Sequence, residues 1–108
     1  MPHRVQLLWF ADCPHYEAAR ALVRELTRRL APDSTLEDVD ASDRAVAERY
    51  RFPGSPTVRI DGTDVDPDFR DSGDYLPRCR LYRTSRGVSG LPDPAWIEAA
   101  LRAEPPEA

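Results

Sequence analysis

The chain has 108 residues, which is enough for one domain with one hydrophobic core and too short for two. Its 15 basic residues are all Arg, against 19 acidic ones, so the net charge is −4 and net charge does not favour nucleic acid as a partner. The absence of Lys excludes Schiff-base chemistry and a P-loop lysine. Two Cys do not make a disulfide scaffold, no apolar run approaches the ~20 residues of a membrane helix, and the first residues lack a signal-peptide pattern. We therefore expect no membrane partner and a reducing, cytoplasmic compartment.

The first third of the chain predicts a buried strand followed by an amphipathic helix. The stretch from Arg4 to Phe10 has apolar residues on both faces, which is typical of a central strand covered on both sides. Pro14 fixes φ and lacks an N–H, so it suits the first position of a helix. The helix should stop near Ala31, before Pro32. Its inner face is predicted from helical spacing to be Ala19, Leu22, Val23, Leu26 and Leu30.

The middle of the chain predicts a strand, a short helix and another strand. Residues 35–40 are half apolar and complete a strand–helix–strand unit. Ser42 or Asp43 can cap a second helix. Residues 57–61 alternate, with Val58 and Ile60 on one face, and 61–62 (Asp-Gly) is a turn signal.

The last third predicts a loop, a strand and a helix. Residues 63–76 hold five aspartates and are expected to form an acidic surface loop. Residues 79–84 read as a strand in which Cys79 alternates with Leu81. Asp93 and Pro94 have the character of an N-cap and a first helical residue. The whole is one domain over residues 1–103, in the order β-α-β-α-β-β-α, followed by a disordered tail at 104–108.

Cys13 is the main candidate for chemistry because it lies between a buried strand and a helix. Unpaired N–H groups and the positive end of the helix macrodipole favour a thiolate at such a place. The thiolate is the nucleophilic form of cysteine and the form that binds soft metals. His15 adds positive charge or moves a proton, whereas Asp12 opposes a nearby anion. The alternative is a buried cysteine that acts as a small hydrophobe.

These elements, with Cys13-Pro14 after the first strand and Ser55-Pro56 before the third, resemble the thioredoxin/glutaredoxin family. The resemblance implies an α/β fold with a mixed four-stranded sheet and helices on both faces. It also implies that Cys13 is the nucleophile and that Pro56 is a cis-proline, whose preceding backbone is left free to pair with an extended substrate. Tyr16 stands where two-cysteine members carry their second cysteine. The resemblance is therefore to the monothiol type, with an external low-molecular-weight thiol and no bound cofactor.

Three strings, FADCPHYEAARAL, FPGSPTVRIDG and CRLYRTSRG, resemble small bacterial proteins labelled either thioredoxin-like or alkylmercury lyase. Cleavage of a mercury–carbon bond needs two thiolates and an acid, and Cys13, Cys79 and Asp12 have those chemistries. However, if Thr84 marks the near end of its strand, Cys79 lies five residues back, roughly 17 Å away at ~3.3 Å per residue. A disulfide or a shared metal needs Cα atoms within about 7 Å. Cys79 is therefore expected to be a structural strand residue, unless the long acidic loop folds back and changes its register.

The sequence thus predicts a thiol–disulfide oxidoreductase acting on a small-molecule or protein thiol or disulfide through a mixed disulfide on Cys13. Two alternatives stay open: a soft-metal or organomercurial handler using Cys13 with Cys79 as a second thiol, and a non-catalytic binding module. No metal site is expected, because Phe69 replaces the glycine of a calcium loop and His3 is far from His15. His15 is assigned as a proton carrier and Tyr16 as a hydrogen-bond donor to the adduct. The substrate-binding residues are expected to be Pro14, Ser55, Pro56 and Arg83. Arg83 is grouped with Arg80 and Arg86, and these three arginines either bind a carboxylate or are simply surface charge.

Overall fold

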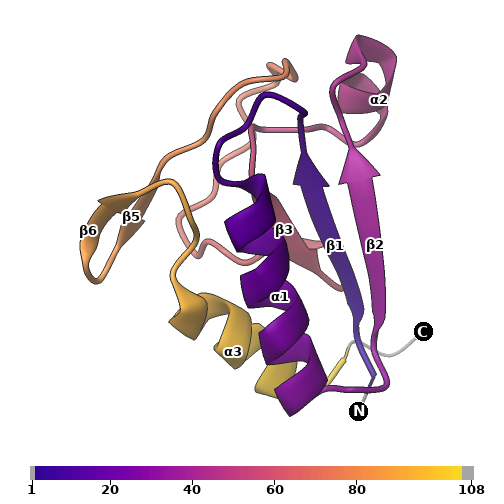
Figure 1. The fold of residues 1–108 in the computed structure, drawn as a ribbon, viewed down its shortest axis with the longest axis vertical. Coiled ribbons are helices and arrows are strands. Elements are labelled where there is room, and N and C mark those ends of the chain that lie inside the picture. Colours follow the sequence, from indigo (N-terminus) through magenta and orange to yellow (C-terminus); the bar gives the residue numbers. More distant parts are fainter. Residues whose placement is uncertain (1, 106–108) are drawn as a thin grey trace.

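A computed structural model describes residues 2–105 of the chain (Figure 1). Three helices and six strands are present in these residues. Residues 104–105 have no regular structure, and the remainder of the predicted tail lies outside the described residues. The elements, in chain order, are β1 (Arg4–Trp9), α1 (Tyr16–Leu30), β2 (Thr35–Asp40), α2 (Arg44–Arg49), β3 (Thr57–Ile60), β4 (Thr63–Asp64), β5 (Tyr82–Thr84), β6 (Gly87–Ser89) and α3 (Pro94–Arg102).

The main sheet has four strands in the order β2-β1-β3-β4. β1 is parallel to β2 and antiparallel to β3, and β3 is antiparallel to β4. The predicted mixed four-stranded sheet is therefore confirmed. Leu8 near the end of β1 pairs with Thr57 at the start of β3, so the residues that follow β1 and those that precede β3 lie at the same end of the sheet.

The fourth strand of the sheet is not the one predicted from the sequence. Residues 63–64 form β4, directly after a two-residue turn in which Asp61 (φ 55°) and Gly62 (φ 83°) both have positive φ. Such an Asp-Gly turn closes a tight hairpin, so the next two residues pair at once with β3. The predictions of a loop beginning at residue 63 and of a sheet strand over 79–84 were wrong. Within 79–84 only β5 is a strand, and it pairs with β6 in a separate hairpin.

The two faces of β1 meet two different core clusters, and helices contribute to both. Val5 and Leu7 of β1 belong to a core cluster formed with α1 and α3, which lie side by side in Figure 1. Leu8, which points the other way, belongs to a second cluster with Ala47 of α2 and Phe52. The two-sided apolar pattern of β1 is thus explained, since each face of the strand meets its own cluster.

The helix starts follow local chemistry, with one exception. The Asp43 carboxylate accepts a hydrogen bond from the Ala45 N–H (2.8 Å) and caps α2, and Asp93 caps α3 in the same way. The exception is α1, which begins at Tyr16 rather than at Pro14. Pro14 therefore lies in a turn before the helix. None of the helices in residues 2–105 is long and apolar enough to cross a bilayer.

Candidate active site

Cys13 lies in the turn between β1 and α1, and its thiol is free. The Cys13 N–H donates a hydrogen bond to the carbonyl of Phe10 (3.0 Å), which closes the turn. The residue is 4% exposed. Because α1 begins three residues later, the helix macrodipole acts on Cys13 from a greater distance than the sequence predicts, and such an effect fades beyond the first turn.

His15 is the N-cap residue of α1, although its side chain makes no capping hydrogen bond. Its ring packs against Gly90, where an added Cβ would lie only 2.5 Å from Nε2 of His15. A larger residue at position 90 would force the His15 ring to move. The contact ties the segment before α3 to the turn that carries Cys13. The role of His15 as a proton carrier stays a prediction.

Tyr16 is held by stacking on Trp9, with ring centroids 4.5 Å apart and an interplanar angle of 12°. The guanidinium of Arg20 covers both rings, 5.1 Å from that of Tyr16 and 5.5 Å from that of Trp9. Arg20 is fixed in turn by Asp38 of β2, which also accepts a hydrogen bond from the Trp9 indole. The hydrogen bond that Arg20 donates to Asp38 raises the pKa of the Arg20 guanidinium. Tyr16 thus orders the start of α1, and its role toward an adduct on Cys13 stays a prediction.

Ser55 and Pro56 lie at the same end of the sheet as Cys13, and the bond between them is cis, as predicted. Both residues are buried. The Ser55 hydroxyl is one of the two buried side-chain polar groups that have no hydrogen-bond partner within residues 2–105. Ser55 therefore has a side chain that can still accept or donate a hydrogen bond.

The backbone of Ser55 is not free, contrary to the prediction. Its N–H donates to the carbonyl of Arg78 (2.8 Å), and its carbonyl accepts from the N–H of Arg80 (2.9 Å). These two bonds form a short parallel bridge in which Ser55 stands opposite Cys79. The chain itself therefore occupies the pairing edge that was assigned to a substrate.

The prediction that Cys79 is a core strand residue far from the end of the sheet that carries Cys13 was wrong. Cys79 is exposed and stands beside Ser55. The error comes from the fourth strand, because the sheet closes with β4 and the insertion after it is free to fold back. Both thiols therefore belong to segments at the same end of the sheet, and both are free.

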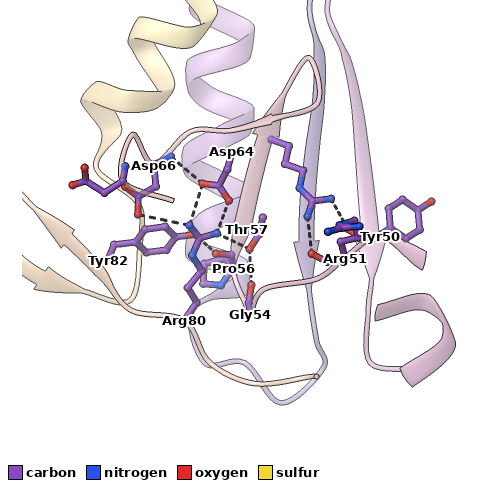
Figure 2. Close-up of polar contacts among 11 residues, drawn as sticks. Tyr50, Arg51, Gly54, Pro56, Thr57, Asp64, Asp66, Arg80 and Tyr82 are labelled. Carbon is purple, nitrogen blue, oxygen red and sulfur yellow. Dashed lines mark hydrogen bonds and ion pairs between the residues drawn. The ribbon is translucent and has the colours of Figure 1, made fainter. Parts of the chain in front are cut away.

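A buried ion pair anchors the segment beside Ser55 (Figure 2). The guanidinium of Arg80 binds both carboxylate oxygens of Asp64, at 2.6 and 3.0 Å, and the Thr57 hydroxyl at 2.9 Å. The two charged side chains are only 10% and 3% exposed. Burial is the largest influence on the pKa of Arg80 and lowers it, but the hydrogen bond that Arg80 donates to Asp64, together with the charges of Asp64 and Asp66, outweighs burial, so the pKa of the guanidinium is raised. The interpretation of Arg80 as surface charge was therefore wrong.

Tyr82 completes this cluster. Its ring lies 4.4 Å from the Arg80 guanidinium, and its hydroxyl donates a hydrogen bond to the carbonyl of Pro56. Burial raises the pKa of the phenol, so the hydroxyl stays protonated and remains a donor at neutral pH. The network runs from β4 through Arg80 to the first residues of β3, and it was missed because no local pattern marks Asp64 as the partner of Arg80.

Arg83 and Arg86 are not part of this network. Arg83 is exposed on β5, in the hairpin that stands apart from the main sheet in Figure 1. Arg86 lines a pocket of about 420 Å³ between the hairpin, α1 and the start of α3, with Leu22 and Leu91 on its apolar wall. The three arginines that the sequence grouped together thus have three different environments.

Within residues 2–105 there is no cluster of three or more His, Cys, Asp or Glu side chains arranged to hold a metal ion. A scan against protein-family models, a search of curated proteins and a search of solved structures each give no match for this chain. The resemblance to the thioredoxin family therefore stays a prediction, and a function can be proposed only from the residues of the site.

Proposed function

We propose that this protein is a thioredoxin-like thiol–disulfide oxidoreductase that works through Cys13 alone. One observation carries the proposal. The turn that holds Cys13 and the Ser55-Pro56 pair lie at the same end of a mixed sheet whose strand order is β2-β1-β3-β4. The element order around them agrees with the family that the sequence resembles. A reducing, cytoplasmic compartment fits the proposal because it supplies the external thiol that the cycle needs.

The chemistry is a pair of thiol–disulfide exchanges. The Cys13 thiolate attacks one sulfur of a disulfide R–S–S–R′, a bond forms between Cys13 and R–S, and R′–S⁻ leaves and takes up a proton. An external thiol then attacks the mixed disulfide and returns Cys13 to its reduced form, so one disulfide is exchanged for another in each cycle. His15 carries protons to and from the sulfurs. Tyr16 replaces a second cysteine in the motif, which excludes a two-thiol cycle between positions 13 and 16.

The test is turnover of a small disulfide, such as bis(2-hydroxyethyl) disulfide, with an external thiol as reductant. We expect Cys13→Ser to lose all turnover above the uncatalysed reaction, because the nucleophile is gone. Cys79→Ser is the matched control, since it removes the other thiol, and it should retain turnover. Equal rates for the wild type and Cys13→Ser would contradict the proposal and would leave a non-catalytic binding module as the better account.

The bridge between Ser55 and Cys79 favours a second candidate function, a soft-metal or organomercurial handler that uses both thiols. Thiolates are the ligands that soft metals prefer, and Cys79 is at the active end rather than remote from it. Titration with Hg(II) separates the two candidates. One ion bound per chain, lost equally in Cys13→Ser and Cys79→Ser, would support the second candidate. Binding that depends on neither thiol would remove it.

A further inference from the structure

Residues 78–80 lie along the backbone of Ser55 as an added strand would. Both polar backbone groups of Ser55 are used in this pairing, the N–H with Arg78 and the carbonyl with Arg80. An extended peptide that adds itself to a sheet edge gains its affinity from main-chain hydrogen bonds of this kind. The edge beside Pro56 is therefore already filled by the chain itself.

Two features outside the pairing hold the segment in place. Gly54 has a φ of +132°, and a Cβ there would lie 2.9 Å from Cβ of Arg80. Only glycine allows residues 78–80 to come this close. The side chain of Arg80 is in addition bound to Asp64 in the buried ion pair and is covered by Tyr82. Gly54 thus permits the close approach of the segment, and the ion pair holds the segment there.

We infer that residues 78–80 are an internal strand that closes the backbone edge of Ser55 to extended peptides, so that the site acts on small disulfides. This inference rests on the proposed function. A peptide must displace both Ser55 hydrogen bonds before it can pair there, whereas a small disulfide has no backbone to pair and does not compete with the strand. Two lost hydrogen bonds correspond to roughly a tenfold or larger preference against the peptide.

The double variant Arg80→Met with Asp64→Asn releases the strand. It removes both charges of the most buried ion pair together and keeps side-chain volume. The carboxylate of Asp66, 3.7 Å from the Arg80 guanidinium, is more exposed than that of Asp64 (16% against 3%). Arg78→Met is the control, because Arg78 is in the same segment and its side chain makes only an exposed ion pair with Asp74. Far-UV circular dichroism establishes that each variant is folded before it is used.

The first measurement is binding, which does not depend on any activity. The probe is a synthetic peptide of residues 76–82 carrying Cys79→Ser, and the readout is the NMR signal of the Ser55 amide. We expect the peptide to shift this signal in the double variant, but not in the wild type or Arg78→Met. Binding to the wild type as tight as to the double variant, or binding to none of the three proteins, would overturn the inference.

The second measurement compares turnover of bis(2-hydroxyethyl) disulfide with turnover of a disulfide carried by an eight-residue peptide. The wild type and Arg78→Met should favour the small disulfide by at least ~10-fold, and the double variant should bring the ratio near one. Equal rates on both substrates in the wild type would overturn the inference while leaving the proposed function in place. If Cys13-dependent turnover is absent with both substrates, the proposed function fails, and the peptide-binding measurement decides the inference by itself.

Discussion

Two segments lie at the end of the sheet that carries Cys13, and they are held in very different ways. The turn before α1 is closed by the hydrogen bond from Cys13 to Phe10 and is tied to a neighbouring loop by one further bond, from the Ala11 N–H to the Ser42 hydroxyl (2.8 Å). Residues 78–80 are held by two backbone bonds and by a nearly buried ion pair between Arg80 and Asp64.

This difference separates the turn that carries the proposed nucleophile from the segment that pairs with Ser55. A buried ion pair gains little net stability, because removing both charges from water costs about as much as their attraction returns. What it contributes here is placement, since the Arg80 guanidinium reaches Asp64 only when the segment lies along Ser55. Because the loss of one partner would leave the other charge buried and unpaired, we expect single substitutions in the anchor to lower stability strongly. Substitutions in the turn should instead change activity.

The largest effect is expected from Arg80→Ala. It leaves the carboxylate of Asp64 buried without its partner, and such a loss costs about 3–5 kcal/mol of folding free energy. Urea unfolding measures the change. Arg78→Ala, in the same segment but with an exposed ion pair, should cost no more than about 1 kcal/mol. Similar losses in the two variants would show that the buried pair does not anchor the segment.

A smaller effect is expected from Gly54→Ala, with Gly73→Ala as its control. Gly73 has a φ of 78°, near the left-handed helical region, where Ala costs roughly 1–2 kcal/mol. Gly54 has a φ of 132°, outside that region, and its new Cβ would also press on Arg80, which adds about 1–3 kcal/mol of overpacking. Urea unfolding of the two variants measures the combined difference. If the two losses were the same, the close approach of the strand to Gly54 would have no energetic importance.

Tyr82→Phe should cost about 1 kcal/mol at neutral pH, because it removes the hydrogen bond to the Pro56 carbonyl. The pH dependence gives a second readout. Burial raises the pKa of Tyr82 in the folded state, so the folded chain keeps its proton when the unfolded chain begins to lose it near pH 10. Stability should therefore fall as pH rises above about 10, and this fall should be shallower in Tyr82→Phe. An unchanged slope would contradict the burial of this phenol.

The smallest effect lies in the exposed part of the insertion, at Asp71. Hydrogen bonds from Arg51, from the Gly73 N–H and from Tyr75 lower the pKa of this carboxyl to about 2. NMR titration of the wild type and Arg51→Gln measures it, and the variant should titrate closer to the ordinary value of ~3.9. Because the pKa of Asp71 is lower in the folded chain than in the unfolded chain, the carboxylate stabilises the fold when the pH is above its ordinary pKa. This stabilisation is lost as the pH falls toward 2. An equal pKa of Asp71 in the two proteins would show that Arg51 does not bind this carboxylate.

The sheet and its helices were predictable because their signals are local. The two-sided apolar pattern of β1, the alternation in β3 and the Asp93-Pro94 helix start each specify an element within a few residues, and each is confirmed. β4 was missed because two residues are too few for alternation to show, even though the Asp-Gly turn before it was recognised. That omission led to the wrong place for Cys79, since a strand was sought further along the chain.

The candidate site was predictable only in part, for a related reason. Cys13 and Pro56 are marked by their places before a helix and before a strand. The pairing of Ser55 with residues 78–80 depends on a contact between segments more than 20 residues apart. The Arg80–Asp64 pair likewise depends on which of five aspartates the folded insertion brings to a given arginine. Spacing along the chain carries no information about that choice.

The central claim is that Cys13 is the reactive thiol, and it is tested most directly by mapping the covalent intermediate. Folded Cys79→Ser protein, which retains only one thiol, is mixed with bis(2-hydroxyethyl) disulfide without any reductant and then quenched with acid. We expect mass spectrometry to find one mixed disulfide per chain on the peptide containing Cys13, with regeneration on addition of an external thiol. A folded chain in which Cys13 stays unmodified would contradict the account.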